Sequence, residues 1–252
     1  MSGDTPARFI TIGFSHYCEK ARWGLDRGGI PYVEEAHPPL IHYRHLRGLG
    51  VGKQVPVLVV DGQPMADSSA ILAWIDARLP ADRLLYPPDL AEEIRSLEDR
   101  FDEDLGPATR RLVYAYGFET PRVMVWTASQ GVPWLDRVLL RLALPFARPK
   151  FSKVVGLEAE DLAQARRTIE EVLAEVDARL ADGRRFLVGD RFTAADLTFA
   201  SLLAPAFLPP AYGAPLPPAE RLAPGYRAWM ASVADHPSVA FARRLYAEER
   251  RR

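Results

Sequence analysis

The chain has 252 residues, enough for one large domain or two modest ones. Its 32 basic and 33 acidic side chains give a formal net charge of −1, which excludes the strongly positive balance typical of nucleic-acid-binding proteins. The single cysteine, Cys18, excludes an internal disulfide and a cysteine-based zinc site. No run approaches the about 18 consecutive apolar residues of a membrane span, so we expect a soluble, cytoplasmic protein.

The first third of the chain alternates between strand and helix patterns. The expected elements are a strand, a helix, a second strand, a hairpin and a second helix, at about residues 9–13, 17–27, 32–36, 55–60 with 63–66, and 67–79. The tight-turn dipeptide Asp61-Gly62 joins the two strands of the hairpin. This order predicts an α/β sandwich of about 80 residues, which we place at 7–82.

Ser15 lies where the first strand turns directly into the first helix. A helix N-terminus presents free N–H groups and the positive end of the helix dipole, so this turn suits an anion such as a thiolate. Cys18 lies one turn further on. On this stretch alone, the simpler interpretation is preferred: Ser15 is a helix cap and Cys18 is a small buried hydrophobe.

Pro56 is unusual inside a strand pattern because proline lacks the N–H that a paired strand needs. The Val55–Pro56 bond is a candidate cis peptide, and the alternative is a trans proline that opens an edge strand. A cis turn would leave the backbone of Val55 free to pair with an extended peptide ligand. Asp67 and Ser68, which open the second helix, offer a carboxylate, a hydroxyl and N–H donors. Sites for a thiolate, a peptide backbone and an amino-acid head together describe glutathione.

Three segments in a fixed order carry a family resemblance: residues 15–22 (SHYCEKAR), 52–58 (GKQVPVL) and 67–71 (DSSAI). This third of the chain resembles the thioredoxin-fold N-terminal domain of the cytosolic glutathione transferase superfamily. The class within the superfamily stays open, although the pattern is nearest to the tau and omega types. His16 stands where proline is usual, and Asp67 stands where glutamate is commoner.

The resemblance implies a role for each of these residues. Ser15 takes the place of the catalytic serine of tau-type members, which is a cysteine in omega-type members. Val55 precedes the family's cis-proline, and its backbone pairs with the cysteinyl part of glutathione. Gln54 contacts the glycyl end. Asp67 and Ser68 form the acid–serine pair that binds the γ-glutamyl end.

Ser15 and the helix after it are sufficient to ionise the thiol of glutathione. From a reference pKa near 8.5, holding the thiol mostly as thiolate at pH 7 needs roughly 3 kcal/mol. A hydroxyl that donates to a charged group supplies about 1.5–3 kcal/mol, and a helix N-terminus adds about 0.3–1 kcal/mol. Cys18 is the alternative catalytic residue, as a nucleophile that forms a mixed disulfide with glutathione. A buried structural thiol is the preferred interpretation of Cys18.

From residue 88 onward strand patterns nearly vanish, which predicts an all-helical C-terminal domain over 88–252. The expected helical stretches are 90–112 with a break at Gly106-Pro107, 162–180, 193–203, and 226–249 with a break near Pro237. Thr193 and Asp196 form a capping-box pattern, with Phe192 placed to staple onto Leu197. This box resembles the one that opens the core helix of the transferase C-terminal domain. The resemblance thus covers most of the chain and implies the glutathione transferase fold.

Residues 119–157 form an insertion between the two long helices, where family members usually have a short connection. From Val123 to Lys153 its basic residues stand against one acid, Asp136. We expect extra helices that cover the mouth of the substrate pocket. A basic amphipathic surface helix that touches a membrane or a partner is the less favoured alternative. Tyr114, Tyr116 and Phe118 are candidate pocket walls, or else core aromatics.

His37, His42 and His45 lie in one loop, but they lack a fourth ligand and a recognisable metal pattern. We expect a solvated loop wall near the glycyl end of the site, and no metal.

By resemblance, the protein is expected to be a glutathione transferase of detoxification type, with glutathione as co-substrate and a homodimeric assembly. It would activate the thiol of glutathione for attack on small electrophiles. One alternative is a glutathione-dependent lyase, peroxidase or thiol reductase. Another is a non-catalytic, transferase-like docking protein whose working surface is the insertion.

Overall fold

The computed structural model describes residues 6–250. Its N-terminal domain holds a four-stranded sheet in the order β2-β1-β3-β4. The strands are β1 (Ala7–Thr11), β2 (Tyr32–Ala36), β3 (Val57–Val60) and β4 (Gln63–Ala66). The helices of this domain are α1 (His16–Gly28), α2 (Tyr43–Leu46), α3 (Ser68–Asp76) and the short η1 (Ala81–Arg83). The predicted order of strands and helices is confirmed.

The third strand begins at Val57, two residues later than the sequence pattern predicts. Pro56 cannot donate to a neighbouring strand, so the ladder begins only after it. β1 runs parallel to β2 and antiparallel to β3, and β3 and β4 form the predicted hairpin.

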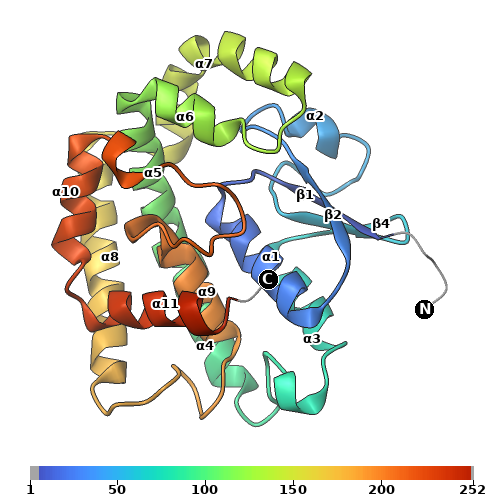
Figure 1. Cartoon of the computed structure of the whole chain (residues 1–252), viewed down its shortest axis with the longest axis vertical. Helices are drawn as coiled ribbons and strands as arrows, with labels where there is room; N and C mark the ends of the chain where they lie inside the picture. The colour runs from blue at the N-terminus through green and yellow to red at the C-terminus, as the bar shows by residue number, and fades with distance from the viewer. Residues whose placement is uncertain (1–5, 251–252) are drawn as a thin grey trace.

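Helix α1 lies between the sheet and the helical domain (Figure 1). Its apolar side chains Trp23 and Leu25 are fully buried in the main core, together with Phe9 of the sheet. Gly24 allows α1 to approach α3 closely, because a Cβ at this position would lie 2.3 Å from Leu72 Cδ2.

The C-terminal domain contains helices and connecting loops, and no strand, in the part that the structure describes. Its helices are α4 (Ala91–Arg100), η2 (Phe101–Leu105), α5 (Gly106–Glu119), α6 (Pro121–Ala128), α7 (Trp134–Val155), α8 (Ala159–Leu180), α9 (Ala194–Leu203), η3 (Ala204–Ala206), η4 (Ala219–Arg221), α10 (Pro224–Val233) and α11 (Pro237–Glu248). Every residue of α9 is buried, as expected of a helix that is apolar on all sides. The break predicted near Pro237 is confirmed, since α11 begins there.

The break predicted at Gly106-Pro107 is wrong. The helix runs without interruption from α4 through η2 into α5, and η2 is a π-helical turn. A proline inside a regular α-helix removes one hydrogen bond and crowds the carbonyl four residues earlier. The wider π turn just before Pro107 changes the hydrogen-bonding register, so the chain passes the proline without ending the helix.

The predicted capping box opens α9. The carboxylate of Asp196 accepts hydrogen bonds from the backbone N–H and the hydroxyl of Thr193, at 2.8 and 2.9 Å. It also accepts one from the backbone of Leu187, at 2.8 Å. Phe192 stacks on Trp23 of α1, with ring centroids 5.5 Å apart, so the box also packs against the N-terminal domain.

None of the helices between residues 6 and 250 combines the length and the apolar character that crossing a bilayer requires.

Candidate active site

Three strand ends meet at one edge of the sheet. Ile10, near the end of β1, pairs with Val57, the first residue of β3. Val57 also pairs with Ala66, the last residue of β4. Because β1 and β3 are antiparallel, and β3 and β4 are too, the end of β1, the start of β3 and the end of β4 lie side by side.

This edge brings together the three predicted ligand segments, at Ser15, Val55 and the pair Asp67–Ser68. Neighbouring strands lie about 4.8 Å apart, so three adjacent strand ends span about 10 Å. An extended chain covers about 3.3–3.6 Å per residue, and a tripeptide therefore matches this span. The three strand ends therefore span a distance similar to the length of a tripeptide.

Ser15 occupies the N-cap position of α1, with φ −68° and ψ 125°. Its backbone N–H donates to the carbonyl of Ile12 at 2.8 Å. Among the residues that the structure describes, its hydroxyl makes no cap hydrogen bond to the backbone of α1. The half-buried hydroxyl therefore does not act as the helix cap that the simpler interpretation of the sequence expects.

Cys18 is fully buried one turn inside α1. Burial raises the pKa of its thiol to about 12, although the charge of Arg22 and hydrogen bonds from Ile12 and Ser15 oppose this shift. The thiol is therefore neutral at physiological pH and out of contact with solvent.

His16, which replaces the family's usual proline, connects α1 to α5. Its ring is buried, and Nε2 lies 3.0 Å from the carbonyl oxygen of Gly106. Burial and the nearby positive charge of Arg110 lower the pKa of His16 to about 3, although the Gly106 carbonyl opposes this. The neutral ring donates to the carbonyl and is a poor general base.

Lys20 forms a buried charged cluster that sequence reasoning missed. Its Nζ atom lies 2.6 Å from Asp102 Oδ2 and 2.9 Å from Glu98 Oε1, and it donates to Ser69 Oγ at 2.9 Å. Tyr17 adds a hydrogen bond to the backbone carbonyl of Asp102 at 2.8 Å. This cluster fastens α1 both to η2 and to the start of α3. The sequence feature that could have revealed this cluster is the lysine within α1, at a position that the fold buries.

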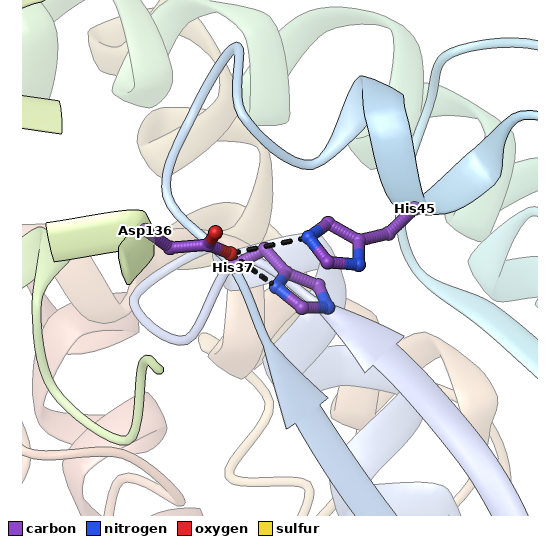
Figure 2. Close-up of side chains that lie close together, drawn as sticks. All are labelled: His37, His45 and Asp136. Atoms are coloured by element: carbon purple, nitrogen blue, oxygen red, sulfur yellow. Dashed lines mark hydrogen bonds and ion pairs between the residues drawn. The ribbon is translucent and has the colours of Figure 1, made fainter. Parts of the chain in front are cut away.

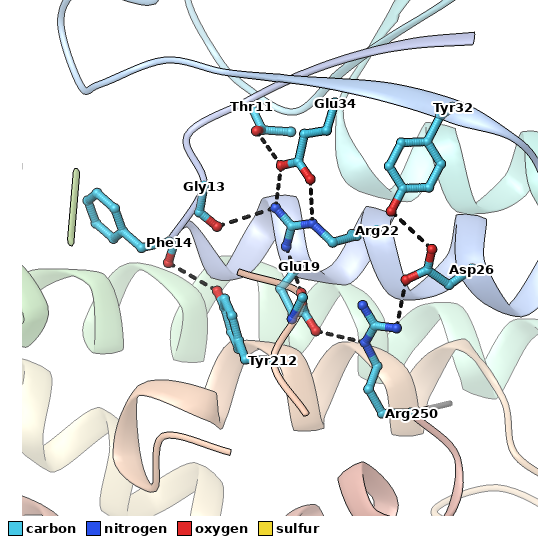
Figure 3. A network of polar contacts seen from close by, with 11 residues as sticks. Thr11, Gly13, Phe14, Glu19, Arg22, Asp26, Tyr32, Glu34, Tyr212 and Arg250 are labelled. Carbon is cyan, nitrogen blue, oxygen red and sulfur yellow. Dashed lines mark hydrogen bonds and ion pairs between the residues drawn. The ribbon is translucent and has the colours of Figure 1, made fainter. Parts of the chain in front are cut away.

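A second charged network surrounds the other side of α1 (Figure 3). Arg22 reaches Glu34 Oε1 and Glu19 Oε2, each at 2.6 Å. Glu19 also accepts from Arg250 Nε at 2.9 Å and from the backbone N–H of Gly213 at 3.0 Å. Segments from both ends of the chain therefore hold the helix whose N-terminus carries Ser15.

The backbone of Val55 is available to a ligand. Within residues 6–250, no hydrogen bond joins its N–H or C=O to another backbone group. The Val55–Pro56 peptide bond is cis. Val55 is half-buried, and the neighbouring Gln54 is exposed.

Asp67 caps α3 and also faces solvent. Its Oδ1 atom accepts from the backbone N–H groups of Ser69 and Ala70, at 2.9 and 3.0 Å. Its backbone has a positive φ of 79°, a conformation that non-glycine residues rarely adopt. Ser68, the next residue, is buried, with 3% of its surface exposed.

An open pocket begins beside Ser15, at Phe14. Its walls come from α5, α6 and the segment 205–226, and they are mostly apolar. The hydroxyl of Tyr212, a lining residue, donates to the carbonyl of Phe14 at 3.0 Å. The pocket and the Ser15 turn therefore share one wall.

Tyr114, Tyr116 and Phe118 are buried, and the described lining of this pocket does not include them. Val113 and Gly117 line it instead, because residues four apart share one face of a helix. Two of the aromatics contact lining rings from behind, so they support the wall.

The histidine loop is not the solvated wall that we expected, because His37 and His42 are buried. His37 Nδ1 and His45 Nε2 lie 2.8 and 3.2 Å from Oδ2 of Asp136 on α7 (Figure 2). Arg44 also pairs with Asp136, and its Nε donates to His45 Nε2 at 2.9 Å. We call this group of four residues the Asp136 clasp.

The Asp136 clasp contains three side chains whose ligand atoms lie within 4.8 Å of one another, close enough to hold a metal ion. The guanidinium of Arg44 already neutralises the carboxylate and would repel a divalent cation at the same place. The arrangement fits a contact between the N-terminal domain and α7 better than a metal centre.

Two family models match the chain. The model of the glutathione S-transferase N-terminal domain matches residues 9–83, and that of the C-terminal domain matches residues 158–232. Together they span more than half of the chain. The protein belongs to the glutathione S-transferase family. A search of curated proteins found no match.

Solved structures of glutathione transferases cover nearly the whole chain. A glutathione S-transferase from Methylobacterium radiotolerans, solved with glutathione sulfonate, is 25% identical, with a TM-score of 0.53 and 94% of each chain covered. A glutathione transferase from Phanerochaete chrysosporium is 16% identical, with a TM-score of 0.64 and 98% of each chain covered. A beta-etherase from Sphingobium is 17% identical, with a TM-score of 0.61, and the match covers 94% of this chain and 98% of that chain. The last two show the shared fold alone.

Proposed function

We propose that the protein is a glutathione transferase that binds glutathione along the sheet edge of β1, β3 and β4. One observation supports the proposal: Ile10, Val57 and Ala66 pair across three adjacent strands, and Ser15, Val55 and Asp67–Ser68 lie within five residues of these strand ends in the chain. Three adjacent strands span about the length of a tripeptide. The similar protein from Methylobacterium radiotolerans was solved with glutathione sulfonate, which supports a ligand of this class.

Ser15 is the residue that stabilises the thiolate. Its hydroxyl is not used to cap α1, and it stands at the positive end of the helix dipole. A hydroxyl hydrogen bond to a thiolate and the dipole together supply about 2–4 kcal/mol, enough to ionise the thiol near pH 7. Cys18 is buried and neutral, which supports a structural role for it.

The remaining segments hold the rest of the tripeptide. The backbone of Val55 pairs with the cysteinyl unit, in the manner of an added strand. The exposed carboxylate of Asp67 faces the α-ammonium group, and Ser68 binds the α-carboxylate at the start of α3. Gln54 contacts the glycyl end.

The apolar pocket beside Phe14 takes the electrophile. Its lining favours apolar compounds, because polar groups bound there would lose hydrogen bonds to water. The thiolate held by Ser15 attacks the electrophilic carbon from the wall beside Phe14. A carbon–sulfur bond forms, and the leaving group departs with the electron pair of the bond that breaks. We also propose, from the family resemblance, a cytoplasmic homodimer that acts in detoxification.

Calorimetric titration with glutathione tests the proposal. We expect saturable binding by the wild type and at least tenfold weaker binding by Ser68→Ala, which loses one hydrogen bond to a charged group. Asp82→Ala is the control, because Asp82 is exposed on η1, away from the sheet edge. Absence of binding at millimolar glutathione in the wild type would overturn the proposed function.

A further inference from the structure

Helix α7 carries a stripe of exposed apolar side chains on its outer surface. The stripe consists of Trp134, Leu135, Val138, Leu139, Leu142 and Phe146, with exposed fractions between 37% and 83%. Scattered exposed apolar residues are ordinary on a soluble protein, but six on one helix are a sign of an interaction surface.

The stripe occupies one side of the helix. At 3.6 residues per turn, its members fall within an arc of about 140°. Asp136 and Leu140 are buried and fall outside this arc, on the side that faces the protein. Arg137 and Arg141, both exposed and one turn apart, follow one border of the stripe. The outer surface of α7 is therefore apolar with a basic margin.

The Asp136 clasp fixes this orientation. Asp136 is fully buried, and its contacts with His37, Arg44 and His45 join α7 to the N-terminal domain. The pocket does not account for the stripe, because α6 supplies the lining from the insertion, with Val123, Met124 and Thr127. The insertion thus contributes α6 to the pocket lining and presents the stripe of α7 to the outside.

The charge of the insertion narrows the choice of partner. Between residues 120 and 157 the sequence holds six basic residues, namely Arg122, Arg137, Arg141, Arg148, Lys150 and Lys153. The one acidic residue in this range is Asp136, which is buried and paired with Arg44. The exposed charges described on α7 are therefore all positive.

A second copy of the protein is a poor partner for this face. A twofold interface brings the same surface of both subunits together, so Arg137 and Arg141 would meet arginines without an acidic counterpart on α7. An anionic lipid surface has the opposite charge. Helices with Trp, Phe and Leu on one face and with arginines beside them bind in the interfacial region of bilayers.

We propose that α7 docks the protein on the surface of membranes rich in anionic phospholipids. The apolar stripe enters the headgroup region, and the two arginines contact lipid phosphates. The helix lies in the plane of the membrane surface, with the Asp136 clasp on the side away from the lipid. The proposal does not depend on the proposed enzymatic function.

Sedimentation with lipid vesicles tests this proposal with the full chain. We expect the protein to pellet with vesicles of phosphatidylcholine mixed with phosphatidylglycerol and to stay in solution with phosphatidylcholine alone. Each arginine near such a surface contributes about 1 kcal/mol, so R137Q with R141Q should weaken binding roughly 30-fold. Arg221→Gln, an exposed arginine on η4, is the matched control and should bind like the wild type.

A second pair of variants tests how much the apolar stripe contributes to vesicle binding. Leu142→Glu should reduce vesicle binding at least tenfold, whereas Val33→Glu should not, because Val33 is 51% exposed on β2, outside the stripe. Tryptophan emission should shift to shorter wavelength on binding, and Trp134→Phe should remove most of this shift. Circular dichroism melts confirm that each variant is folded.

Two results would overturn the proposal. One is a folded wild type that does not sediment with the mixed vesicles at low salt. The other is a wild type that sediments as a dimer and becomes a monomer on Leu142→Glu, since the stripe would then be a subunit interface.

Discussion

The two helix starts at the sheet edge use their polar residues differently. Ser15 stands at the N-cap of α1, but its hydroxyl makes no cap hydrogen bond to the backbone in the described structure. Asp67 caps α3 through one carboxylate oxygen, and it remains exposed. A hydroxyl not used as a cap suits a thiolate, and an exposed carboxylate suits an ammonium group. Under the proposed function, the hydroxyl of Ser15 would face the thiolate and the carboxylate of Asp67 would face the ammonium group.

Asp67→Asn separates the cap from the charge. Asparagine keeps an oxygen for the two backbone N–H groups of α3, so thermal stability should stay within about 0.5 kcal/mol of the wild type. The negative charge opposite the ammonium group is lost, and the affinity for glutathione should fall roughly tenfold or more.

Asp67→Ala provides the comparison for this prediction. It should lose the same affinity and also about 1 kcal/mol of stability, because the cap is gone. Calorimetry and thermal unfolding measure the two quantities separately. Wild-type affinity in Asp67→Asn would show that the carboxylate does not contact the ligand.

Among the helices and strands, α1 does most to position the candidate site. It holds Ser15, and it packs between the sheet and α9. Lys20 on one side and Arg22 on the other are buried, and both are paired with carboxylates. Buried ion pairs add little net stability, but they become strongly destabilising when one partner is removed. The two networks therefore fix where α1 lies.

Lys20→Met should lower the free energy of unfolding by about 3–5 kcal/mol, because Glu98 and Asp102 lose their cation. Burial already raises the pKa of Asp102, and Lys20 opposes that shift. The double variant Lys20→Met, Asp102→Asn should recover part of the loss. Denaturant unfolding gives these values.

The exposed pair Arg8–Glu35 is the control, and Arg8→Met should cost less than about 1 kcal/mol. A similarly small effect of Lys20→Met would show that the buried cluster does not hold α1.

The contact between α8 and α11 should depend on pH. His236 Nδ1 lies 2.6 Å from Asp177 Oδ2, and this hydrogen bond raises the pKa of His236 above its usual 6.5. The stabilisation is complete below pH 6.5 and is lost as the pH rises through the pKa in the folded state. Burial would raise the pKa of Asp177, but bonds from His236 and Ser238 lower it below 3.8, so the pair persists until the pH falls through that pKa.

His236→Gln should therefore destabilise the protein at about pH 5.5 and have almost no effect at about pH 9. The loss should be about 0.2–1 kcal/mol, the range of ion pairs that keep contact with solvent, because 26% of the His236 side chain and 21% of the Asp177 side chain are exposed. Denaturant unfolding at both pH values measures it. An equal loss of stability at both pH values would show that the effect comes from packing and not from the ion pair.

At the scale of the whole molecule, local patterns predicted most of the fold. Three short-range signals are confirmed in the structure: the apolar strand runs, the Asp61-Gly62 turn of the hairpin and the Thr193 capping box. The predicted break at Gly106-Pro107 failed because a π turn absorbs the proline, and nothing in the local sequence marks that turn.

The candidate site was predictable only in part. Ser15, Val55 and Asp67 belong to contiguous motifs, whereas the Lys20 cluster and the Asp136 clasp join residues that lie far apart in the sequence. The pocket lining also depended on the phase of α5, where a one-residue difference separates Val113 from Tyr114. Such pairings are set by tertiary packing, which composition and spacing do not specify.

The thiol pKa of bound glutathione is the most direct test of the account, because it depends on the assembled site. The ultraviolet absorbance of the thiolate, followed as the pH is raised, gives this pKa. We expect it to lie well below the reference near 8.5 in the wild type and to rise by about 1–2 units in Ser15→Ala. Cys18→Ala should keep this pKa low, because that thiol is buried and its removal leaves the Ser15 hydroxyl in place to donate to the thiolate. An identical titration in the wild type and in Ser15→Ala, with glutathione bound to both, would contradict the role of Ser15.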